Sequence, residues 1–558
     1  MKKIGILIDS ADCSQYFYDT INELATSREV ELFFLQNKYV EPKKNILGKI
    51  KSALNTRGFL YAITSIFFHL LINVEQKVFS LFFQAIKNHH KRISINKFIK
   101  NEIIDIRPVL STSETTVFYS DEDIEKIKLL HLDLILVDSF SDILLKGNIL
   151  KSATKGVLSF CYSDTRWKRG GPPAFWEVYL RKPSTGFVLQ ILTEEPGGGP
   201  IAFRGSIATR RSYTENVVDL YRESNPYLAK LILHYATNDS LPVLEEKFPY
   251  SGSFWDIPSV LQSIIYLIKT FFLFFSLVVE RFILARDKRW GIAFIGTSWE
   301  NAILSQGTRV KNPPDHFFAD PFVITKNGRT ICFVEDYCYT EKKAVIAAIE
   351  IAGQKQYKLL GPVIQEPFHM SFPYLFEYDN ELYMVPETSE GNAIRLYKCI
   401  EYPLKWKYIK DIMSNVKAVD SIVFEYENRW WMLSTISTQG NEDDASQLLA
   451  YYSDSPLSDN WIAHAQNPLI FDSDIARNGG FLGGEGSLPV RSRQKQGFNA
   501  YGVALSLARI TELTPTTYSE EEIGKIVPNF FSDIERCHHI HSNGIYTVYD
   551  YLSTETIK

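Results

Sequence analysis

Acidic side chains recur at matching places in the second half of the chain. Segments that begin at Ala319, Ser371 and Val419 each combine a polar or proline corner, an apolar run, a turn and a second apolar run. Asp320 and Asp420 occupy the same corner in the first and third segments. A period of about 50 residues with several strands per repeat is typical of propeller blades, in which equivalent residues converge on one mouth. Carboxyl groups gathered there would raise one another's pKa, as a general acid requires.

The segments around these carboxylates resemble the five-bladed propellers of glycoside hydrolase family 43. They are closer still to the propeller-like region of plant glucosamine inositolphosphorylceramide transferases. The resemblance covers about residues 290–552 and is carried by HFFADPF, FVEDY, HMSFPYLFE, YMVPETSE and SIVFEYENRWWML. It implies Asp320 as the base, Asp420 as a helper and Glu485 as the acid of an inverting mechanism. Three more side chains would line the same mouth: Glu335, His369 and Glu387.

Each of these residues also has a structural interpretation. Asp320 precedes a proline and can be a turn residue, Asp420 can be a hydrogen-bonding blade corner, and His369 can be a structural histidine. His538, His539 and His541 suggest zinc, but such a pattern alternates between the faces of a strand and has no partner cluster in the sequence. We therefore predict no metal.

A second set of polar residues lies at 156–205, where a strand ends in SFCYSD and a loop reads RGGPP. With Thr185 and Gly186, this stretch resembles the formyltransferase family, and the resemblance extends over residues 1–236. In that family an Asn, a His and an Asp hold and activate the formyl group of 10-formyltetrahydrofolate. The matching positions here are Ser159, Cys161 and Gly197.

The three replacements imply a formyltransferase fold without formyl transfer, because Ser and Cys do not supply an amide donor and an imidazole base. We therefore expect no cofactor; 10-formyltetrahydrofolate would bind only if an atypical site were active. A sugar-nucleotide pocket is the alternative use of this fold. Its candidate binding residues are Asp164, Arg169 and Glu177.

The elements around that site alternate between strands and helices. KIGILID, EVELFFL, LDLILVDS and GVLSFCYSD read as buried strands, and DILLKGNILKSA reads as a helix. This order predicts a doubly wound α/β sheet with its ligand at the carboxyl ends of the strands. No GxGxxG or GxxxxGK[ST] follows the first strand, which argues against a dinucleotide or P-loop site.

Two apolar helical stretches interrupt this pattern. One runs from Phe59 to about Ile86, and the other occupies residues 257–289. Between Ile257 and Val279 the only charged residue is Lys269, and four basic residues follow. The second stretch is long enough to span about 30 Å of hydrocarbon. A helix lying in the membrane interface, a spanning helix and a buried core helix all remain open.

Composition narrows the function classes. The chain has 558 residues and a net charge of −5, which argues against nucleic acid as a partner. Six cysteines without paired spacing suit a reducing compartment. The apolar run after the first lysines is too short for a signal peptide, so we expect a cytoplasmic protein or one peripheral on an inner membrane.

Together these observations predict an α/β domain at 1–236, an apolar helical linker at 237–289 and an all-β five-bladed propeller at 290–558. The function they favour is a transferase that acts on a sugar nucleotide or glycan in bacterial surface polysaccharide or glycolipid synthesis. The alternatives are an inverting hydrolase, a non-catalytic glycan-binding scaffold and a formyltransferase with an atypical site. A transferase in the first domain that uses Asp164 or Glu177 as its base is a further possibility.

Overall fold

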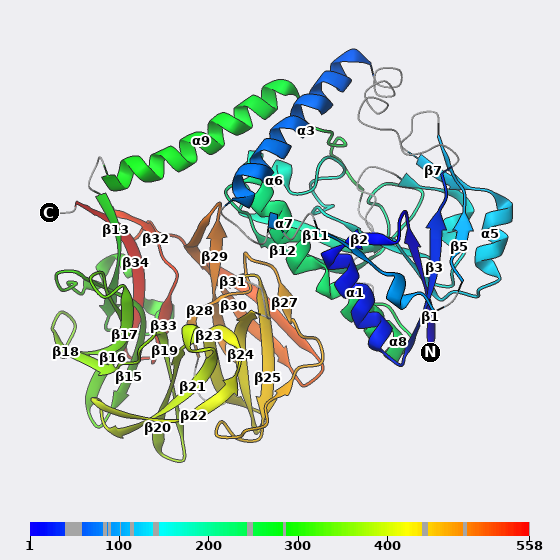
Figure 1. Ribbon diagram of the computed structural model, residues 1–558. Coiled ribbons are helices and arrows are strands. Elements are labelled where there is room, and N and C mark those ends of the chain that lie inside the picture. Colours follow the sequence, from blue (N-terminus) through cyan, green and yellow to red (C-terminus); the bar gives the residue numbers. More distant parts are fainter. Residues whose placement is uncertain are drawn as a thin grey trace. The chain divides into compact units, whose positions relative to one another are not determined.

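The structure is a computed structural model that divides into two compact units, unit 1 (Met1–Phe274) and unit 2 (Phe275–Lys558) (Figure 1). The residues it describes are 1–39, 58–81, 86–87, 91–100, 102–111, 116–137, 144–242, 249–282, 286–437, 445–483 and 488–556.

Unit 1 is built on a seven-stranded sheet of order β12-β11-β10-β8-β1-β3-β5. The strands from β10 to β5 are parallel, and β11 and β12 extend the sheet in antiparallel fashion. The strand order reverses direction between β1 and β8, as the doubly wound fold class predicts. The strands are β1 (Lys2–Ile8), β3 (Val30–Asn37), β5 (Ile104–Ile106), β8 (Leu134–Val137), β10 (Val157–Cys161), β11 (Ser184–Ile191) and β12 (Ile201–Ala208).

Short strands accompany this sheet. β2 (Asp12–Ser14) pairs with β4 (Arg92–Ser94), and β6 (Pro108–Leu110), β7 (Thr116–Tyr119) and β9 (Leu144–Leu145) form a three-stranded sheet. The predicted helix DILLKGNILKSA is wrong in its described part, which holds β9 and a 3₁₀ turn at Gly147–Lys151. Gly147 has φ +81, a left-handed conformation that interrupts a right-handed helix.

Serines start three of the helices of unit 1. The Oγ atoms of Ser14, Ser120 and Ser212 accept hydrogen bonds from backbone N–H groups in the first turns of α1, α5 and α7. The helices are α1 (Gln15–Thr26), α3 (Phe59–Ser80), α5 (Asp121–Lys128), α6 (Phe175–Tyr179), α7 (Tyr213–Ser224) and α8 (Pro226–Asn238). A further helix, α9 (Val260–Phe282), begins in unit 1 and ends in unit 2.

Unit 2 consists of antiparallel meanders. Two four-stranded sheets hold β15 (His316–Lys326), β16 (Arg329–Cys338), β17 (Lys343–Ile351) and β18 (Tyr357–Ile364), then β19 (Ser371–Tyr378), β20 (Glu381–Glu387), β21 (Ala393–Glu401) and β22 (Lys405–Ser414). A five-stranded sheet holds β23 (Lys417–Tyr426), β24 (Arg429–Ser437), β25 (Gln447–Ser453), β26 (Ile462–Ala463) and β27 (Ile470–Phe471).

The fourth sheet is nine-stranded and contains two further meanders. One is β28 (Asn478–Leu482), β29 (Val490–Gly497), β30 (Ala500–Leu513) and β31 (Tyr518–Ile526). The other is β33 (Ile540–Ser542), β34 (Thr547–Thr556), β13 (Arg286–Ile295) and β14 (Thr308–Arg309), with β32 (Ile534–Arg536) beside β34. Counted over the described strands, these two meanders and the three other sheets give the five blades of the predicted propeller.

A strand from the start of unit 2 closes the ring against the last blade. β13 pairs with β34 along its whole length, from Arg286 opposite Thr556 to Ile295 opposite Thr547. The fourth blade begins at β28 with Asn478. The GGEG string at 483–486 follows this strand and lies partly outside the described residues.

A β-bulge interrupts the first strand of each of the first three blades. The register shifts between Ala319 and Phe322, and the corresponding shifts follow Ser371 and Val419. One residue inside each bulge has a left-handed backbone, with φ +49 at Asp320, +45 at Phe372 and +51 at Asp420. Such values are uncommon for residues other than glycine, and a bulge changes the direction of a side chain.

Candidate active site

The bulges and the strands beside them bring acidic residues together. In blade one, Ala319 lies opposite Glu335 in the register, and in blade two Ser371 lies opposite Glu387. Glu335 and Glu387 therefore occupy equivalent places on second strands, next to the bulged first strands. We refer to the group that these strands assemble as the carboxylate cluster, which consists of Asp320, Glu335, His369, Glu387, Asp420, Arg477, His538 and Asp550.

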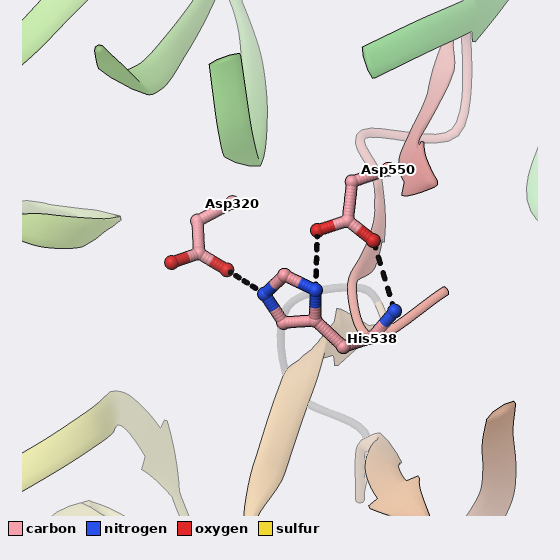
Figure 2. A group of neighbouring side chains, drawn as sticks. All are labelled: Asp320, His538 and Asp550. Carbon is pink, nitrogen blue, oxygen red and sulfur yellow. Dashed lines mark hydrogen bonds and ion pairs between the residues drawn. The ribbon is translucent and has the colours of Figure 1, made fainter. Parts of the chain in front are cut away.

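His538 connects two acids of the carboxylate cluster (Figure 2). Its Nε2 lies 3.0 Å from Asp320 Oδ1, and its Nδ1 lies 3.0 Å from Asp550 Oδ2. The backbone N–H groups of His538 and His539 donate to Asp550 Oδ1 at 2.9 Å each. Burial lowers the pKa of His538, but the charge of Asp550 and the hydrogen bond to Asp320 raise it to about 10. His538 is therefore an imidazolium at neutral pH.

Asp320 is the ionised member of the cluster. Burial would raise its pKa, but the hydrogen bond and the charge of His538 lower it to about 2. Its second oxygen, Oδ2, accepts a hydrogen bond from the backbone N–H of Phe372 at 3.2 Å. This contact joins the bulges of blades one and two, so that the carboxylate is fixed from two sides.

Asp420 is held by blade four. Its Oδ2 accepts hydrogen bonds from Arg477 Nε at 2.6 Å and from Gln494 Nε2 at 3.0 Å. Its backbone carbonyl accepts one from Asn478 Nδ2 at 2.7 Å. Burial raises the pKa of Asp420, and the charge of Arg477 opposes that rise. Arg477 also approaches Glu387, with 4.0 Å between Nη2 and Oε2.

Glu335 and Glu387 are driven toward the protonated form. Burial raises the pKa of Glu335 well above its usual value, and the charge of Asp320 adds to the effect. Burial likewise raises the pKa of Glu387, and the negative charge of Asp420 raises it further. His369 Nε2 lies 3.5 Å from Glu335 Oε1, and burial lowers the pKa of His369, which favours the neutral ring. The cluster thus combines one carboxyl group of lowered pKa with two carboxyl groups of raised pKa, a separation that acid and base roles require.

An aromatic side chain lies over the cluster. The residue Tyr501 is 43% exposed, and its ring centroid lies 5.4 Å from that of His538. The Arg477 guanidinium lies 5.7 Å from the centroid of the same ring. Trp290 packs on His538 from within the protein, with ring centroids 4.1 Å apart. Tyr501 therefore places a partly exposed aromatic side chain, of the kind that can pack on a sugar, beside buried acids.

The structure brings five of the predicted site residues into one cluster: Asp320, Glu335, His369, Glu387 and Asp420. Glu485, the predicted acid, lies outside the described residues. Sequence reasoning missed Arg477, Tyr501 and Asp550, and it considered His538 only as a zinc ligand. The single available signal for His538 was the unusual HHIH string, whereas nothing in the sequence distinguishes Asp550 from other strand residues.

The three residues of Figure 2 also lie close enough together to hold a metal ion, since one ligand atom from each lies within 4.8 Å of the others. To bind a metal, the imidazole would have to be neutral, and one of its nitrogens and both carboxylates would have to point at the same ion. Here the two carboxylates lie at opposite nitrogens of one charged ring, an ion-paired arrangement that matches no zinc geometry. The prediction of no metal stays a prediction.

The candidate site of unit 1 has a different character. Ser159 Oγ donates to the carbonyl of Phe160 at 3.3 Å. Burial raises the pKa of the Cys161 thiol, so that the reactive thiolate is disfavoured. Gly197 has φ +62, and a Cβ there would lie 3.3 Å from Arg169 Cδ. The side chains at these positions therefore supply no base comparable to an imidazole.

The acids of unit 1 are engaged in ion pairs. Asp164 Oδ2 lies 2.8 Å from Arg166 Nη2, and its Oδ1 lies 2.7 Å from Arg204 Nη1. Burial opposes ionisation of Asp164, but these arginines lower its pKa, the hydrogen bonds from Arg166 most of all. Glu177 is fully buried with Lys168, at 3.0 Å. Without solvent exposure, Glu177 has no access to a substrate in this conformation.

Arg169 lies beside an aromatic ring. Its guanidinium is 4.6 Å from the centroid of Tyr250, a cation–π contact, and its Nε donates to the carbonyl of Thr165 at 3.3 Å. The residue thus holds the segment at 249–256 against the loop that the sequence matched to formyltransferases.

Comparison with known proteins places the carboxylate cluster almost wholly inside one matched region. Residues 298–537 match the family model described as the N-terminal part of glucosamine inositolphosphorylceramide transferase 1. The rice (Oryza sativa subsp. japonica) protein of that name is 32% identical over 212 residues, which are 37% of this chain and 28% of the rice protein. The chain thus spans little more than a quarter of the length of this relative.

Two solved structures with similarity to the chain are a glycoside hydrolase domain and a transformylase. The catalytic domain of Coprinopsis cinerea GH62 α-L-arabinofuranosidase is 12% identical, with a TM-score of 0.33, and covers 48% of this chain and 96% of its own. Glycinamide ribonucleotide transformylase 1 from Symbiobacterium toebii is 11% identical, with a TM-score of 0.27, and covers 44% of this chain and 92% of its own.

Proposed function

We propose that unit 2 is a glycosyltransferase whose chemistry takes place at the carboxylate cluster. The observation that carries the proposal is the convergence of acids from adjacent blades, with the pKa of Asp320 lowered by His538 and the pKa of Glu387 raised by burial. The matched relatives are named as transferases of glucosamine and inositolphosphorylceramide, and the matched region holds every cluster residue except His538 and Asp550. A sugar donor and a glycolipid or glycan acceptor are therefore the proposed substrates.

The proposed reaction exchanges one bond at the anomeric carbon of the donor sugar. The bond to the leaving oxygen breaks, and a bond to an acceptor hydroxyl forms. Glu387 gives its proton to the leaving oxygen, and Asp320 takes the proton of the acceptor hydroxyl. A carboxylate of low pKa suffices, because that hydroxyl becomes strongly acidic as its oxygen bonds to an oxocarbenium-like carbon. The negative charge of Asp320 also stabilises this carbon.

His538 and Arg477 act as positioning residues in this proposal. His538 keeps Asp320 ionised, and Asp550 keeps His538 protonated. Arg477 binds Asp420 and lies near Glu387. Its positive charge compensates the negative charge that either acid carries when it is ionised. The partly exposed side chain of Tyr501 provides a packing surface for a sugar.

For unit 1 we propose that formyl transfer has been lost and that no folate cofactor is used. The support is the pairing of Asp164 and Glu177 with basic residues and the raised pKa of Cys161. Surface polysaccharide or glycolipid synthesis at the cytoplasmic side of a bacterial inner membrane is the proposed setting. Purified protein that N-formylates amino-sugar nucleotides with 10-formyltetrahydrofolate would overturn the proposal for unit 1.

The test of the transferase proposal uses the full chain, nucleotide sugars that include amino sugars, and inositolphosphorylceramide as acceptor, with products measured by mass spectrometry. We expect Asp320→Asn and Glu387→Gln each to lower kcat by about 100-fold or more. Glu377→Gln is the matched control, because Glu377 lies on the same blade as Glu387 but is exposed and paired with Lys326.

Full turnover in both cluster variants would refute the mechanism. Loss of turnover only in Glu485→Gln would move the acid role to the residue that the sequence predicted. Sugar release to water without any acceptor product would favour the hydrolase alternative. Retained glycan binding with no turnover in the unmodified chain would favour the non-catalytic scaffold.

A further inference from the structure

Helix α9 turns its polar residues toward unit 1. Ser263 and Tyr266 are buried, and Lys269 Nζ donates to the carbonyl of Tyr179 at 3.0 Å. The Tyr266 hydroxyl accepts a hydrogen bond from the Tyr213 backbone N–H at 2.8 Å and donates to Glu75 Oε2 at 2.6 Å. The face that would be exposed in an ordinary amphipathic helix is therefore the face that contacts the protein.

The opposite face of α9 is apolar and exposed. Leu261 is 66% exposed, Phe271 is 64% exposed and Phe272 is 57% exposed. The other exposed large apolar side chains on this face within unit 1 recur every three or four residues: Ile264, Leu267, Ile268 and Phe274.

Helix α3 repeats the arrangement. An exposed apolar stripe runs along it at Phe59, Ile63, Leu70, Val74 and Val78, spaced by four or, once, seven residues, which is one or two helical turns. Its acidic residue, Glu75, points inward and accepts hydrogen bonds from Tyr266 and from the Thr214 backbone N–H, the latter at 2.8 Å. Exposed polar residues, His69 and Asn73, lie along one edge of the stripe.

The Glu75–Tyr266 hydrogen bond joins the two helices, which are far apart in the sequence (Figure 1). We call their exposed faces together the apolar face of unit 1. In water such a face is unfavourable, because large contiguous apolar patches are rare on soluble proteins and mark interaction sites.

We propose that the apolar face of unit 1 lies on a lipid bilayer whose surface carries anionic headgroups. Exposed cations border the face: Lys77 stands in the last turn of α3, and Arg181 contacts the carbonyl of Lys269 on α9 at 3.5 Å. Lys182 follows Arg181 and is also exposed. Basic residues beside an apolar surface complement anionic lipid, as in helices that lie in the membrane interface.

The helices lie on the bilayer and do not cross it. By length and composition alone, Phe59–Ser80 could cross a membrane. Crossing would separate Glu75 from Tyr266 and from Thr214 and would place a carboxyl group in hydrocarbon. The proposed membrane contact is independent of glycosyl transfer and involves unit 1 alone. It extends the membrane contact expected for residues 257–289 to a second helix, α3.

The test is sedimentation of the full chain with vesicles of phosphatidylcholine containing about 30% phosphatidylglycerol, a mixture with an anionic surface. We expect the chain to sediment with these vesicles and to be released by alkaline carbonate. The double variant Phe271→Asp with Phe272→Asp should weaken partitioning into the vesicles at least about tenfold. The reason is that two phenylalanine side chains no longer move from water into the bilayer. Val74→Asp tests α3 separately.

The matched control is Ile400→Asp with Ile545→Asp, because these isoleucines are 58% and 57% exposed and lie in unit 2. Circular dichroism must show that every variant is folded. Sedimentation that is unchanged in both the α9 and the α3 variants overturns the inference, as does equal loss in the control. Resistance to carbonate would refute the interfacial position. Self-association of the chain without vesicle binding would assign the face to a second copy and refute the lipid proposal.

Discussion

The pairing of His538 with Asp320 and Asp550 predicts a pH dependence of stability that a single substitution should abolish. The folded-state pKa of His538, about 10, lies above its ordinary value of 6.5. The pairing therefore stabilises the fold fully below about pH 6.5, and this stabilisation is lost as the pH rises toward 10. The lowered pKa of Asp320 makes stability depend on pH only in acid, below about pH 4. It therefore does not affect the pH dependence between about 6.5 and 10.

The magnitude follows from the two pKa shifts. The rise from 6.5 to about 10 for His538 corresponds to about 5 kcal/mol, and the fall from 3.8 to about 2 for Asp320 corresponds to about 2 kcal/mol. The two values differ because Asp550 also contributes to the shift of His538. Burial opposes the charged form of both groups, and the pH dependence follows from the shift of His538, with about 5 kcal/mol as its upper bound.

The assay is urea unfolding followed by tryptophan fluorescence at pH 7, 8 and 9, for the unmodified chain and for His538→Gln. Between pH 7 and 9 the free energy of unfolding should fall by about 2 to 3 kcal/mol more in the unmodified chain than in the variant. His541→Gln is the matched control: burial lowers the pKa of His541 to about 3, so it carries no charge in this range. Parallel pH profiles for the unmodified chain and His538→Gln would refute the imidazolium assignment.

Other predictions concern packing and buried charge. Glu75→Ala should destabilise unit 1 by about 1–3 kcal/mol, because two donors lose their acceptor, whereas Glu75→Gln should cost less; thermal unfolding distinguishes the two. Lys168→Met should cost about 3–5 kcal/mol by isolating the charge of Glu177, and adding Glu177→Leu should restore most of it; equal destabilisation in the double variant would contradict this. Gly480→Ala should prevent folding of unit 2, since its Cβ would lie 2.0 Å from the carbonyl of Ile540 at φ +114; a native circular dichroism spectrum would refute it.

The parts of the site that could be predicted are those that repeat along the chain. Asp320 and Asp420 stand in equivalent bulges, so that the blade period alone placed them together. Glu335 and Glu387 follow from the same repeat, one strand later. The fold class could be predicted for the same reason, since buried strands and blade repeats leave periodic patterns.

The parts that were missed come from contacts without local pattern. His538 lies 218 residues from Asp320, and Arg477 lies 57 residues from Asp420. Charges of this kind are identified by their partners, which only the folded chain reveals. Composition likewise showed that α9 is apolar but not which of its faces is exposed; the hydrogen bond between Tyr266 and Glu75 settles that orientation.

The closure of the propeller by β13 and β34 has a consequence for synthesis of the chain. Thr297 and Thr547, which join the ends of these two strands, are 250 residues apart. At about 5–20 residues per second, a ribosome needs roughly 12 to 50 s to make the intervening chain. Throughout that interval β13 exposes an unpaired edge, and neither His538 nor Asp550 exists. The nascent protein therefore passes through a stage that is vulnerable to aggregation, and the last blade both pairs with β13 and supplies His538 and Asp550 to the carboxylate cluster.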